Sequence, residues 1–579
     1  MTTPPNRRPG KAAVFAGLLA LFGLGCLADW YVAIPEEAVA GYVGRERCIS
    51  CHQQEASDWA GSHHDRAMEL ATDDTVLGDF DNAEFTRLGV TTRFYRKGAE
   101  YWVRTEGPDG EMHDYRVDYT FGVDPLQQYM VELEGGRVQV LRVSWDTVRN
   151  EWFYVPPPDA VDERLEPDDP LHWTGLAQNW NTMCAECHST NLQKNFTLAS
   201  NTYDTTYSEI DVSCEACHGP GSLHAELAES RSLFWDRRRG YALSGLKNAS
   251  NRKQLEACAP CHSRRTAIHG DWHAGNRFFD HFAPSLLEPG LYHADGQILD
   301  EVYVYGSFLQ SKMYHENVKC TDCHNPHSLK LKFEGNQLCA QCHQPGKYDG
   351  AGHHHHAGAG EAAQQCVNCH MPERHYMVVD GRRDHSFRVP RPDLSVELGT
   401  PNACNDCHTK PEEDAAWAAE AVREWYGDKR PDDPHYAPAL AAGWEGKPEA
   451  VEMLREVLRR DYPEIVHATA VRALGRIADA EAQKLCREAV DERSPLVRAT
   501  ALRAAAERSI DEMALESAWH LRDSARLVRF AAASRLVERA PQLQGTEHEP
   551  ILQEALEEYQ TGQEVILDRA GTNMQRAAL

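Results

Sequence analysis

One five-residue motif, Cys-x-x-Cys-His, occurs eight times in this chain and constrains its fold more than any other feature. Seven copies lie between Cys184 and His408, and the first stands apart near the N-terminus. Together the copies use sixteen of the 18 cysteines. Numbered in chain order, the motifs begin at Cys48, Cys184, Cys214, Cys258, Cys320, Cys339, Cys366 and Cys404.

This motif is the attachment signature of c-type haem. The two thiols add to the haem vinyl groups, and the histidine that follows reaches the iron as the proximal ligand. We therefore predict eight covalently attached haem c groups, each with its iron. The predicted attachment residues and proximal ligands are Cys48, Cys51 and His52; Cys184, Cys187 and His188; Cys214, Cys217 and His218; Cys258, Cys261 and His262; Cys320, Cys323 and His324; Cys339, Cys342 and His343; Cys366, Cys369 and His370; Cys404, Cys407 and His408.

Two other uses of paired cysteines fit less well. Zinc ribbons and knuckles also contain Cys-x-x-Cys, but a zinc site gives no reason for histidine directly after the second cysteine. All eight pairs carry that histidine, although only 29 of the 579 residues are histidine. A disulfide framework is weaker still, because the motifs leave only two cysteines over.

Length and charge limit the remaining possibilities. A chain of 579 residues allows about three or four domains. The formal charge of −28, from 60 basic and 88 acidic residues, argues against nucleic acid or anionic lipid as the main partner. It suits an electron carrier that meets redox partner proteins of basic character, although acidity that serves only solubility is an equal alternative. Neither the electron donor, the acceptor nor the oligomeric state follows from the sequence.

The N-terminus predicts export. Haem is attached to reduced cysteines outside the cytoplasm, and the apolar run Ala12 to Leu27 follows basic residues, as in a signal sequence. This run is short for a membrane span, and Asp29 interrupts it. Because no small-x-small cleavage site is evident, we favour an uncleaved anchor; a cleaved signal and a lipoprotein at Cys26 are the alternatives. All three place the body in the periplasm or outside the cell, and an anchor would tether it to the inner membrane.

The chain divides into three parts by composition. Residues 1–40 form the anchor and linker, 41–410 the octahaem domain, and 411–579 a helical region. Between the first two motifs, alternating apolar residues such as Arg137 to Val143 predict a β-rich insertion at about 75–160, either a structural cap or a docking surface. Elsewhere the haem region has few periodic segments, so porphyrins are expected to take the place of an aliphatic core. The fold class is mixed: mostly α-helical or irregular around haem, with a β insertion.

The C-terminal part shows an internal repeat. Segments beginning at Ile465, Leu496 and Leu527 align at a period of 31 residues, each rich in alanine, leucine and arginine. This pattern is typical of stacked helix pairs and predicts an all-α solenoid resembling HEAT repeats. An ordinary helical bundle is the alternative.

Further histidines are candidates for the second axial position of each iron. Two histidine ligands allow electron transfer with little reorganisation, whereas an open position can bind substrate. A histidine shortly after a motif cannot easily bend to its own haem, so it is expected to serve a neighbour. In the run His353 to His356 one member is a ligand, or the run is a solvated metal-binding loop. The ranked candidates are His64, His224, His315, His327, His375 and His385, followed by His281 and His293.

Several stretches carry a family resemblance. The first motif with Trp59 and His64 behind it, and His218-Gly-Pro-Gly with His224 behind it, resemble multihaem cytochromes related to hydroxylamine oxidoreductase and the octahaem nitrite and tetrathionate reductases. Over residues 41–411 the chain also resembles bacterial octahaem cytochromes with C-terminal HEAT or tetratricopeptide repeats. The resemblance implies haems packed in close stacked and perpendicular pairs. No Cys-x-x-Cys-Lys motif occurs, which counts against the nitrite-reducing subclass.

The predicted function is electron relay along a chain of haems. The alternative is an oxidoreductase that acts on a small nitrogen or sulfur compound at one haem with an open distal position. Arg264, Arg265 and His269 are the nearest candidates for a polar pocket there, but adjacent arginines more often pair with propionates, so no catalytic residue is assigned. A third possibility is an assembly module in which the haems are structural.

Overall fold

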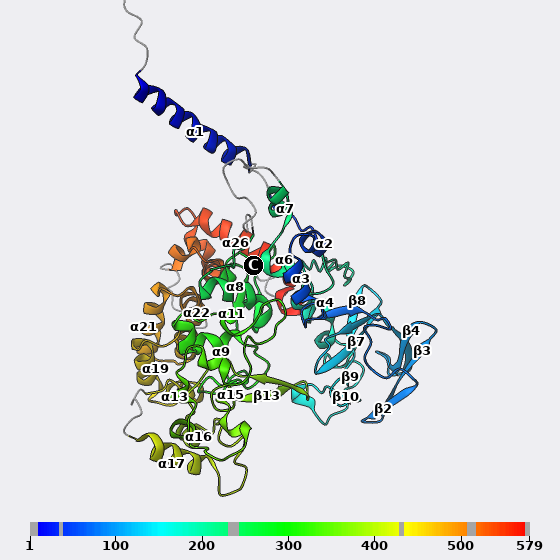
Figure 1. Cartoon of the computed structure of the whole chain (residues 1–579). Coiled ribbons are helices and arrows are strands. Elements are labelled where there is room, and N and C mark those ends of the chain that lie inside the picture. Colours follow the sequence, from blue (N-terminus) through cyan, green and yellow to red (C-terminus); the bar gives the residue numbers. More distant parts are fainter. Residues whose placement is uncertain (1–9, 34–38, 230–242, 428–433, 507–516, 574–579) are drawn as a thin grey trace, which may run out of the picture.

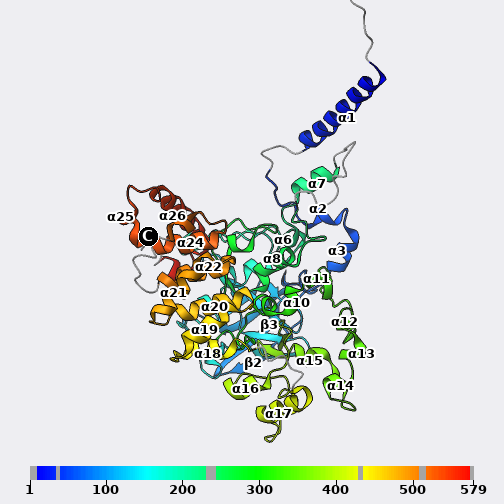
Figure 2. The same ribbon diagram turned by 90° about the vertical axis from the view of Figure 1, so that its left-hand side faces the viewer.

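The computed structural model describes residues 10–33, 39–229, 243–427, 434–506 and 517–573. A single N-terminal helix projects from the body, which has three parts (Figure 1). The motif region lies in the centre, the β insertion on one side and the C-terminal helical array on the other. After a quarter turn the array stays at one side and the β insertion lies behind the motif region (Figure 2). The basic residues ahead of Lys11 lie outside the described ranges.

The projecting helix α1 (Lys11–Ala33) is longer than the apolar run seen in the sequence. It continues through Asp29, because helical hydrogen bonds do not require apolar side chains. Its leucines are exposed; Leu21, for example, is 66% exposed. Residues 11–29 are long and apolar enough to cross a membrane, and none of that window is buried in the body. At about 1.5 Å per residue, the 23 residues span about 34 Å, comparable to the bilayer core.

The β insertion consists of two antiparallel sheets. One has the strand order β2-β3-β4-β5, and the other β1-β6-β7-β9-β10 with β8 paired to β7. Phe94 and Val103 face each other across β3 and β4 and are fully buried, and the Phe94 ring stacks on Trp152 at 3.5 Å. The strands are β1 (Met68–Leu70), β2 (Ala83–Arg87), β3 (Val90–Lys97), β4 (Glu100–Glu106), β5 (Met112–Val117), β6 (Tyr119–Phe121), β7 (Leu126–Leu133), β8 (Arg137–Val140), β9 (Val143–Asp146) and β10 (Glu151–Tyr154).

The motif region is built from short helices joined by loops and two small hairpins. The longest of these helices is α8 (Asn251–His262), which ends in the fourth motif. The others are α2 (Arg45–Ile49), α3 (Gln53–Trp59), α4 (Trp180–Met183), α5 (Ala185–His188), α6 (Cys214–His218), α7 (Ser222–Glu229), α9 (Tyr305–Gln310), α10 (Lys312–His315), α11 (Cys320–Cys323), α12 (Gln337–Ala340), α13 (Pro345–Tyr348), α14 (Ala351–His354), α15 (Cys366–His370) and α16 (Pro392–Leu398). The hairpins are β11 (Arg265–Ala267) with β12 (Phe282–Pro284), and β13 (Glu373–Tyr376) with β14 (Asp380–Arg383).

The helical array follows the period seen in the sequence. The three repeated segments form α20 (Glu464–Gly475), α22 (Pro495–Ala506) and α24 (Arg526–Leu536), and each packs against the next. Their alanines and leucines are buried between neighbouring helices. The remaining helices are α17 (Ala415–Tyr426), α18 (Ala437–Glu445), α19 (Ala450–Arg459), α21 (Ala480–Glu488), α25 (Ala540–Leu543) and α26 (Glu549–Gln563).

The array and the motif region share one apolar core. Buried residues from Leu255 to Leu309 belong to the same cluster as those from Tyr436 to Ala555. The backbone N–H of Leu287 donates to the Thr469 hydroxyl at 3.1 Å, so polar contacts also cross this boundary. The array therefore supports the motif region along its length and is not a separately packed unit.

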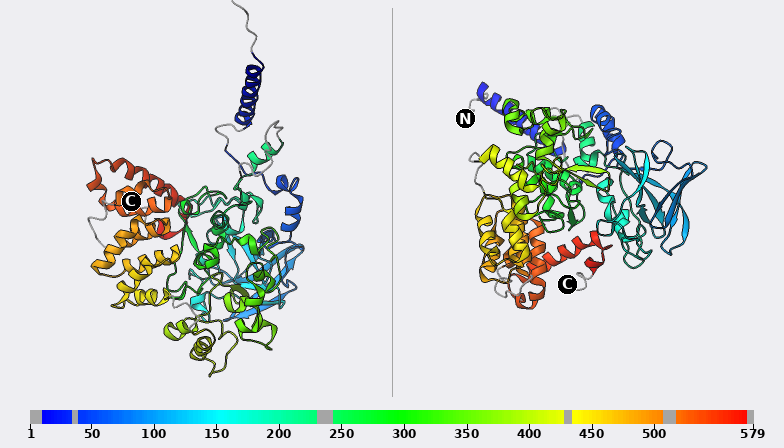
Figure 3. Two further views of the ribbon diagram at one scale, coloured as in Figure 1. Left: turned by 60° about the vertical axis from the view of Figure 1, so that its left-hand side comes forward. Right: turned by 90° about the horizontal axis from the view of Figure 1, so that it is seen from below.

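The end of the array returns to the second motif. The Asp568 carboxylate is fully buried and accepts from Lys194 Nζ at 2.7 Å and from the Thr182 hydroxyl, two residues before Cys184. Viewed from below, the C-terminal segment crosses from the array towards the β insertion (Figure 3). The second motif is thus held between the insertion and the end of the array.

Substitution of Gly562 tests this close packing. A Cβ at Gly562 would meet the carbonyl oxygen of Ile268 and lie 2.8 Å from the Phe530 ring. Gly562→Ala should therefore lower the free energy of unfolding by about 1–3 kcal/mol, seen as a lower thermal midpoint. Gly571→Ala is the matched control, because a Cβ there has open space. Equal midpoints for the two variants would show that the array does not pack against residue 268 as described.

Candidate haem-binding site

Each motif presents its two thiols and its imidazole on one side of a helical turn. The backbone N–H of the histidine donates to the backbone carbonyl of the first cysteine, at 3.0 Å in the first motif and 2.9 Å in the eighth. Residues three and four apart in a helical turn lie on the same face. The Cys-x-x-Cys-His spacing therefore places all three functional side chains where one flat group can meet them.

Thiols of different motifs lie close enough to shift each other's pKa. The pairs are Cys48 with Cys214, Cys187 with Cys261, Cys258 with Cys320, and Cys339 with Cys366. None of the sixteen motif cysteines forms a disulfide. Motifs far apart in the sequence, such as the first and third, are thus neighbours in space.

Electrostatic interactions extend this pattern to the remaining motifs. Burial raises the pKa of Cys323, with smaller contributions from Asp322 and from Cys342 of the sixth motif. Burial and then Cys407 of the eighth motif raise the pKa of Cys369. The pKa of both cysteines of the fourth motif is raised by a partner thiol and by burial, and Cys217 of the third motif adds a smaller contribution in the same direction. All eight motifs are therefore connected, in the order one, three, four, five, six, seven and eight, with the second joined to the fourth.

Six motif histidines face a second histidine at nearly constant separation. Each pair joins a proximal ligand to a histidine outside any motif, and in each the ring centroids lie between 6.1 and 6.5 Å apart. The pairs are His52 with His224 (6.2 Å), His262 with His64 (6.3 Å), His218 with His327 (6.4 Å), His324 with His385 (6.5 Å), His370 with His353 (6.1 Å) and His408 with His356 (6.2 Å).

This separation fits a haem iron between the rings. A metal-bound imidazole nitrogen lies about 2 Å from its metal, and the ring centroid about 1 Å further back, so two opposed ligands have centroids about 6 Å apart. Rings at that distance are too far apart to hydrogen-bond to each other directly. The separation is the one that two opposed ligands of a single iron would need.

Burial in the motif region fits haem as well. Across residues 312–391, which contain three motifs, only Asp384 and Ser386 are buried, and both are polar. A folded stretch of this length normally buries many apolar side chains. The lack of buried apolar side chains is therefore consistent with flat apolar groups that attach to the motifs and supply the missing interior.

The environment of the paired histidines favours the neutral, ligating form. Burial lowers the pKa of His64 to about 4, and His262, His188 and His63 lower it further. Burial also lowers the pKa of His262 and His385. In the seventh motif, His370 Nδ1 lies 2.8 Å from the Arg388 carbonyl, which leaves the other ring nitrogen available to bind a metal.

Two motif histidines have aromatic neighbours in place of a partner histidine. The His188 ring lies 4.4 Å from Phe121 of the β insertion, and the His343 ring lies 5.6 Å from Tyr348. Within the described part of the chain, no second histidine ring lies at 6.1–6.5 Å from either. The second and sixth motifs therefore differ from the other six.

The other four histidines that the sequence offered as second ligands do not lie opposite a motif histidine. His315 packs on Tyr314 at 5.4 Å, and His375 is 60% exposed beside Glu373. His281 Nδ1 lies 2.9 Å from the Gly270 carbonyl, and His293 Nε2 lies 3.3 Å from Arg374. None of the four reaches a motif histidine at the pair distance. His353 and His356 both do, whereas the sequence indicated at most one ligand in that run.

Arg264, Arg265 and His269 do not converge on one pocket. Arg265 forms an ion pair with Glu186 of the second motif at 2.6 Å and so ties the fourth motif to the second. Arg264 pairs with Asp300 at 2.8 Å, and His269 Nδ1 lies 2.9 Å from the Gly270 carbonyl. Their roles are structural links between segments.

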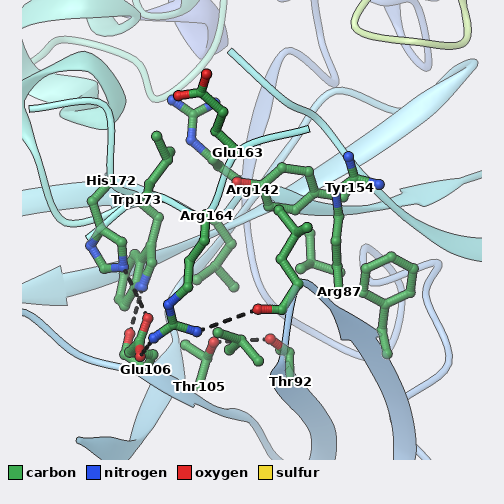
Figure 4. A pocket seen from close by; sticks show the side chains of 16 residues that line it. Arg87, Thr92, Thr105, Glu106, Arg142, Tyr154, Glu163, Arg164, His172 and Trp173 are labelled. Atoms are coloured by element: carbon green, nitrogen blue, oxygen red, sulfur yellow. Dashed lines mark hydrogen bonds and ion pairs between the residues drawn. The ribbon is translucent and has the colours of Figure 1, made fainter. Parts of the chain in front are cut away.

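A separate cavity lies in the β insertion (Figure 4). Arg164 pairs with Glu106 at 2.6 Å on one wall, and the Thr92 and Thr105 hydroxyls meet at 2.9 Å on the floor. His172 approaches Glu106 from behind, at 3.9 Å. No motif residue lines this cavity, so it is distinct from the haem-binding region.

Comparison with known proteins finds c-type cytochrome segments and helical repeats in this chain. Residues 47–83 and 171–219 match the family of cytochrome c554 and c-prime, residues 314–348 match the doubled CXXCH motif, and residues 451–537 match HEAT repeats. Among curated proteins there is no match. A crystal structure of the outer cell wall cytochrome OcwA is similar, with a TM-score of 0.43 and 17% identity over 80% of this chain and 99% of that one.

The family matches confirm several predictions. The chain contains cytochrome c554 and paired CXXCH haem-binding segments followed by HEAT repeats, and it is a multihaem c-type cytochrome. The CXXCH segments confirm covalently bound haem c as its cofactor.

The histidine pairs can be tested one at a time. His327→Ala should convert one low-spin iron to a high-spin one that binds carbon monoxide when reduced, because the His218 ring then has no partner. His375→Ala is the control, since that side chain is 60% exposed and, among the described residues, lies at the pair distance from no motif histidine. Electron paramagnetic resonance detects the high-spin iron, and the difference spectrum with carbon monoxide detects its binding of that ligand. A high-spin signal from the His375 variant alone would reverse the assignment.

Proposed function

We propose that this cytochrome is exported, carries eight haems and relays electrons along them. The observation that carries the proposal is the set of six histidine pairs, which supports two histidine ligands at each of six irons. A bound haem accepts and releases one electron at a time. The chain itself supplies the order, through contacts between attachment residues of successive motifs.

Paired imidazoles suit relay better than catalysis. If both axial positions of an iron are filled by neutral side chains, the ligands need not move when the charge of the iron changes, and reorganisation stays small. Each partner histidine comes from a segment near another motif: His224 follows the third motif but faces His52 of the first, and His64 follows the first but faces His262 of the fourth. Loss of one segment would therefore disturb two sites.

The ends of the connected series are exposed. Cys51 of the first motif and Cys407 of the eighth are exposed to solvent at the two ends, and Cys342 of the sixth motif is exposed inside the series. Electrons can thus enter or leave near either end, with redox proteins as partners, and the net charge of −28 favours partners with basic surfaces. The exposed apolar helix α1 supports attachment to the inner membrane, with the body in the periplasm.

The second motif supports an alternative function. His188 has no histidine partner at the pair distance, and Tyr303 and Arg382 lie beside this motif. Burial, then Glu301 and Cys187, raise the pKa of Tyr303, whose φ of +60° is unusual for a residue other than glycine. Arg382 lies 5.7 Å from the Tyr303 ring, and it adds to the burial that lowers the pKa of His188. A small nitrogen or sulfur oxyanion could be held there, as the resemblance to octahaem reductases implies.

Counting haems and ligand-binding irons tests the relay. The pyridine haemochrome assay should find eight haem c groups per chain. In the reduced protein, carbon monoxide should bind at most two irons, those of the motifs that contain His188 and His343. Binding to three or more would contradict the histidine pairs.

Substrate turnover tests the alternative. If the second motif is catalytic, the protein should reduce nitrite, hydroxylamine or tetrathionate with a reduced dye as donor. Arg382→Gln should then lower kcat/KM by about 10- to 100-fold, since it removes a charged hydrogen-bond donor. Arg264→Gln, which removes an arginine paired elsewhere, should retain turnover. Absence of turnover with all three compounds would leave the relay alone.

A further inference from the structure

The run His353 to His356 reaches two motifs at once. His353 faces His370 of the seventh motif at 6.1 Å, and His356 faces His408 of the eighth at 6.2 Å. His354 ends the short helix α14, and His355 is left-handed, with φ of +56°. The turn at His355 directs the histidines on either side of it to different motifs.

The segment around this run has little packing of its own. Gly346, Gly350, Gly352, Gly358 and Gly360 flank it, and a Cβ at any of them would meet nothing within 4 Å. Glycine-rich chain loses much conformational freedom when it is ordered. Contacts from outside the segment must therefore hold the four histidines in place.

Those contacts come from the last two residues of α17, the first helix of the array. The His355 ring stacks on Trp425 with centroids 4.3 Å apart and planes 7° apart. The Tyr426 hydroxyl donates to the His353 carbonyl, and its ring lies edge-on to His355 at 5.6 Å. Inside the run, the His356 N–H donates to His354 Nδ1 at 3.0 Å.

We propose that Trp425 is a positioning residue that sets the coordination of the seventh and eighth haems together. Its stack with His355 fixes the run so that His353 and His356 both occupy axial positions, and loss of the stack releases both. The inference rests on the proposed function, since it takes these two histidines to be iron ligands. The stack thereby couples one end of the helical array to the seventh and eighth motifs, at one end of the proposed relay.

The test compares variants of the full-length protein with all haems attached. Trp425→Ala should turn two low-spin irons into high-spin irons that bind carbon monoxide, while Trp425→Phe, which keeps a stacking ring, should behave as wild type. Arg423→Ala, at a 71% exposed side chain on the same helix, is the matched control. His355→Ala removes the other ring of the same stack and should have the same effect as Trp425→Ala. It keeps the test decisive if Trp425→Ala itself attaches fewer haems.

Single-ligand variants separate the two levels of the argument. His353→Ala and His356→Ala should each create one high-spin iron, about half the signal of Trp425→Ala. If neither creates one, the proposed ligation fails. If both do, but Trp425→Ala and His355→Ala leave every iron low-spin or release only one, the proposed joint positioning is overturned.

Discussion

Residues 312–391 lack the apolar interior that a folded stretch of protein needs. Residues 312–391 adopt a defined path around three motifs, yet only Asp384 and Ser386 among them are buried. Protein interiors are close-packed, and a chain without an apolar interior does not offset the entropy lost on ordering. In the proposed arrangement, thioether bonds and histidine ligands would give the haems fixed positions, and the haems would act as the interior. Cofactor binding and folding would then be one process in this stretch.

The helical array has the opposite character. Its helices α20, α22 and α24 bury rows of alanine, valine and leucine, and their core continues into residues 255–309 of the motif region. At one end Trp425 and Tyr426 hold the histidine run, and at the other Asp568 meets Lys194 near the second motif. The array and residues 255–309 thus form one apolar core, which lies beside a stretch, residues 312–391, that buries no apolar side chain. This favours a scaffold over a separate docking platform for the repeats.

The sequence predicts the haem sites and the repeats, because both depend on local spacing. Choosing the second histidine of each pair requires tertiary structure. His327 and His375 both follow a motif closely, but His375 lies in β13, where alternation turns it outward, whereas His327 lies in a turn and faces His218. His353 and His356 were hidden in a glycine-rich run that looks solvated in sequence. The interruption at Asp29 likewise did not end α1.

Amide hydrogen exchange tests the central claim most directly. The comparison is between the holoprotein and a variant in which the cysteines of the fifth, sixth and seventh motifs are replaced by serine. We expect amides across residues 312–391 to lose their protection in the variant, while those of α20, α22 and α24 keep theirs. Equal protection of residues 312–391 in both proteins would contradict the claim that haem supplies the interior of this region.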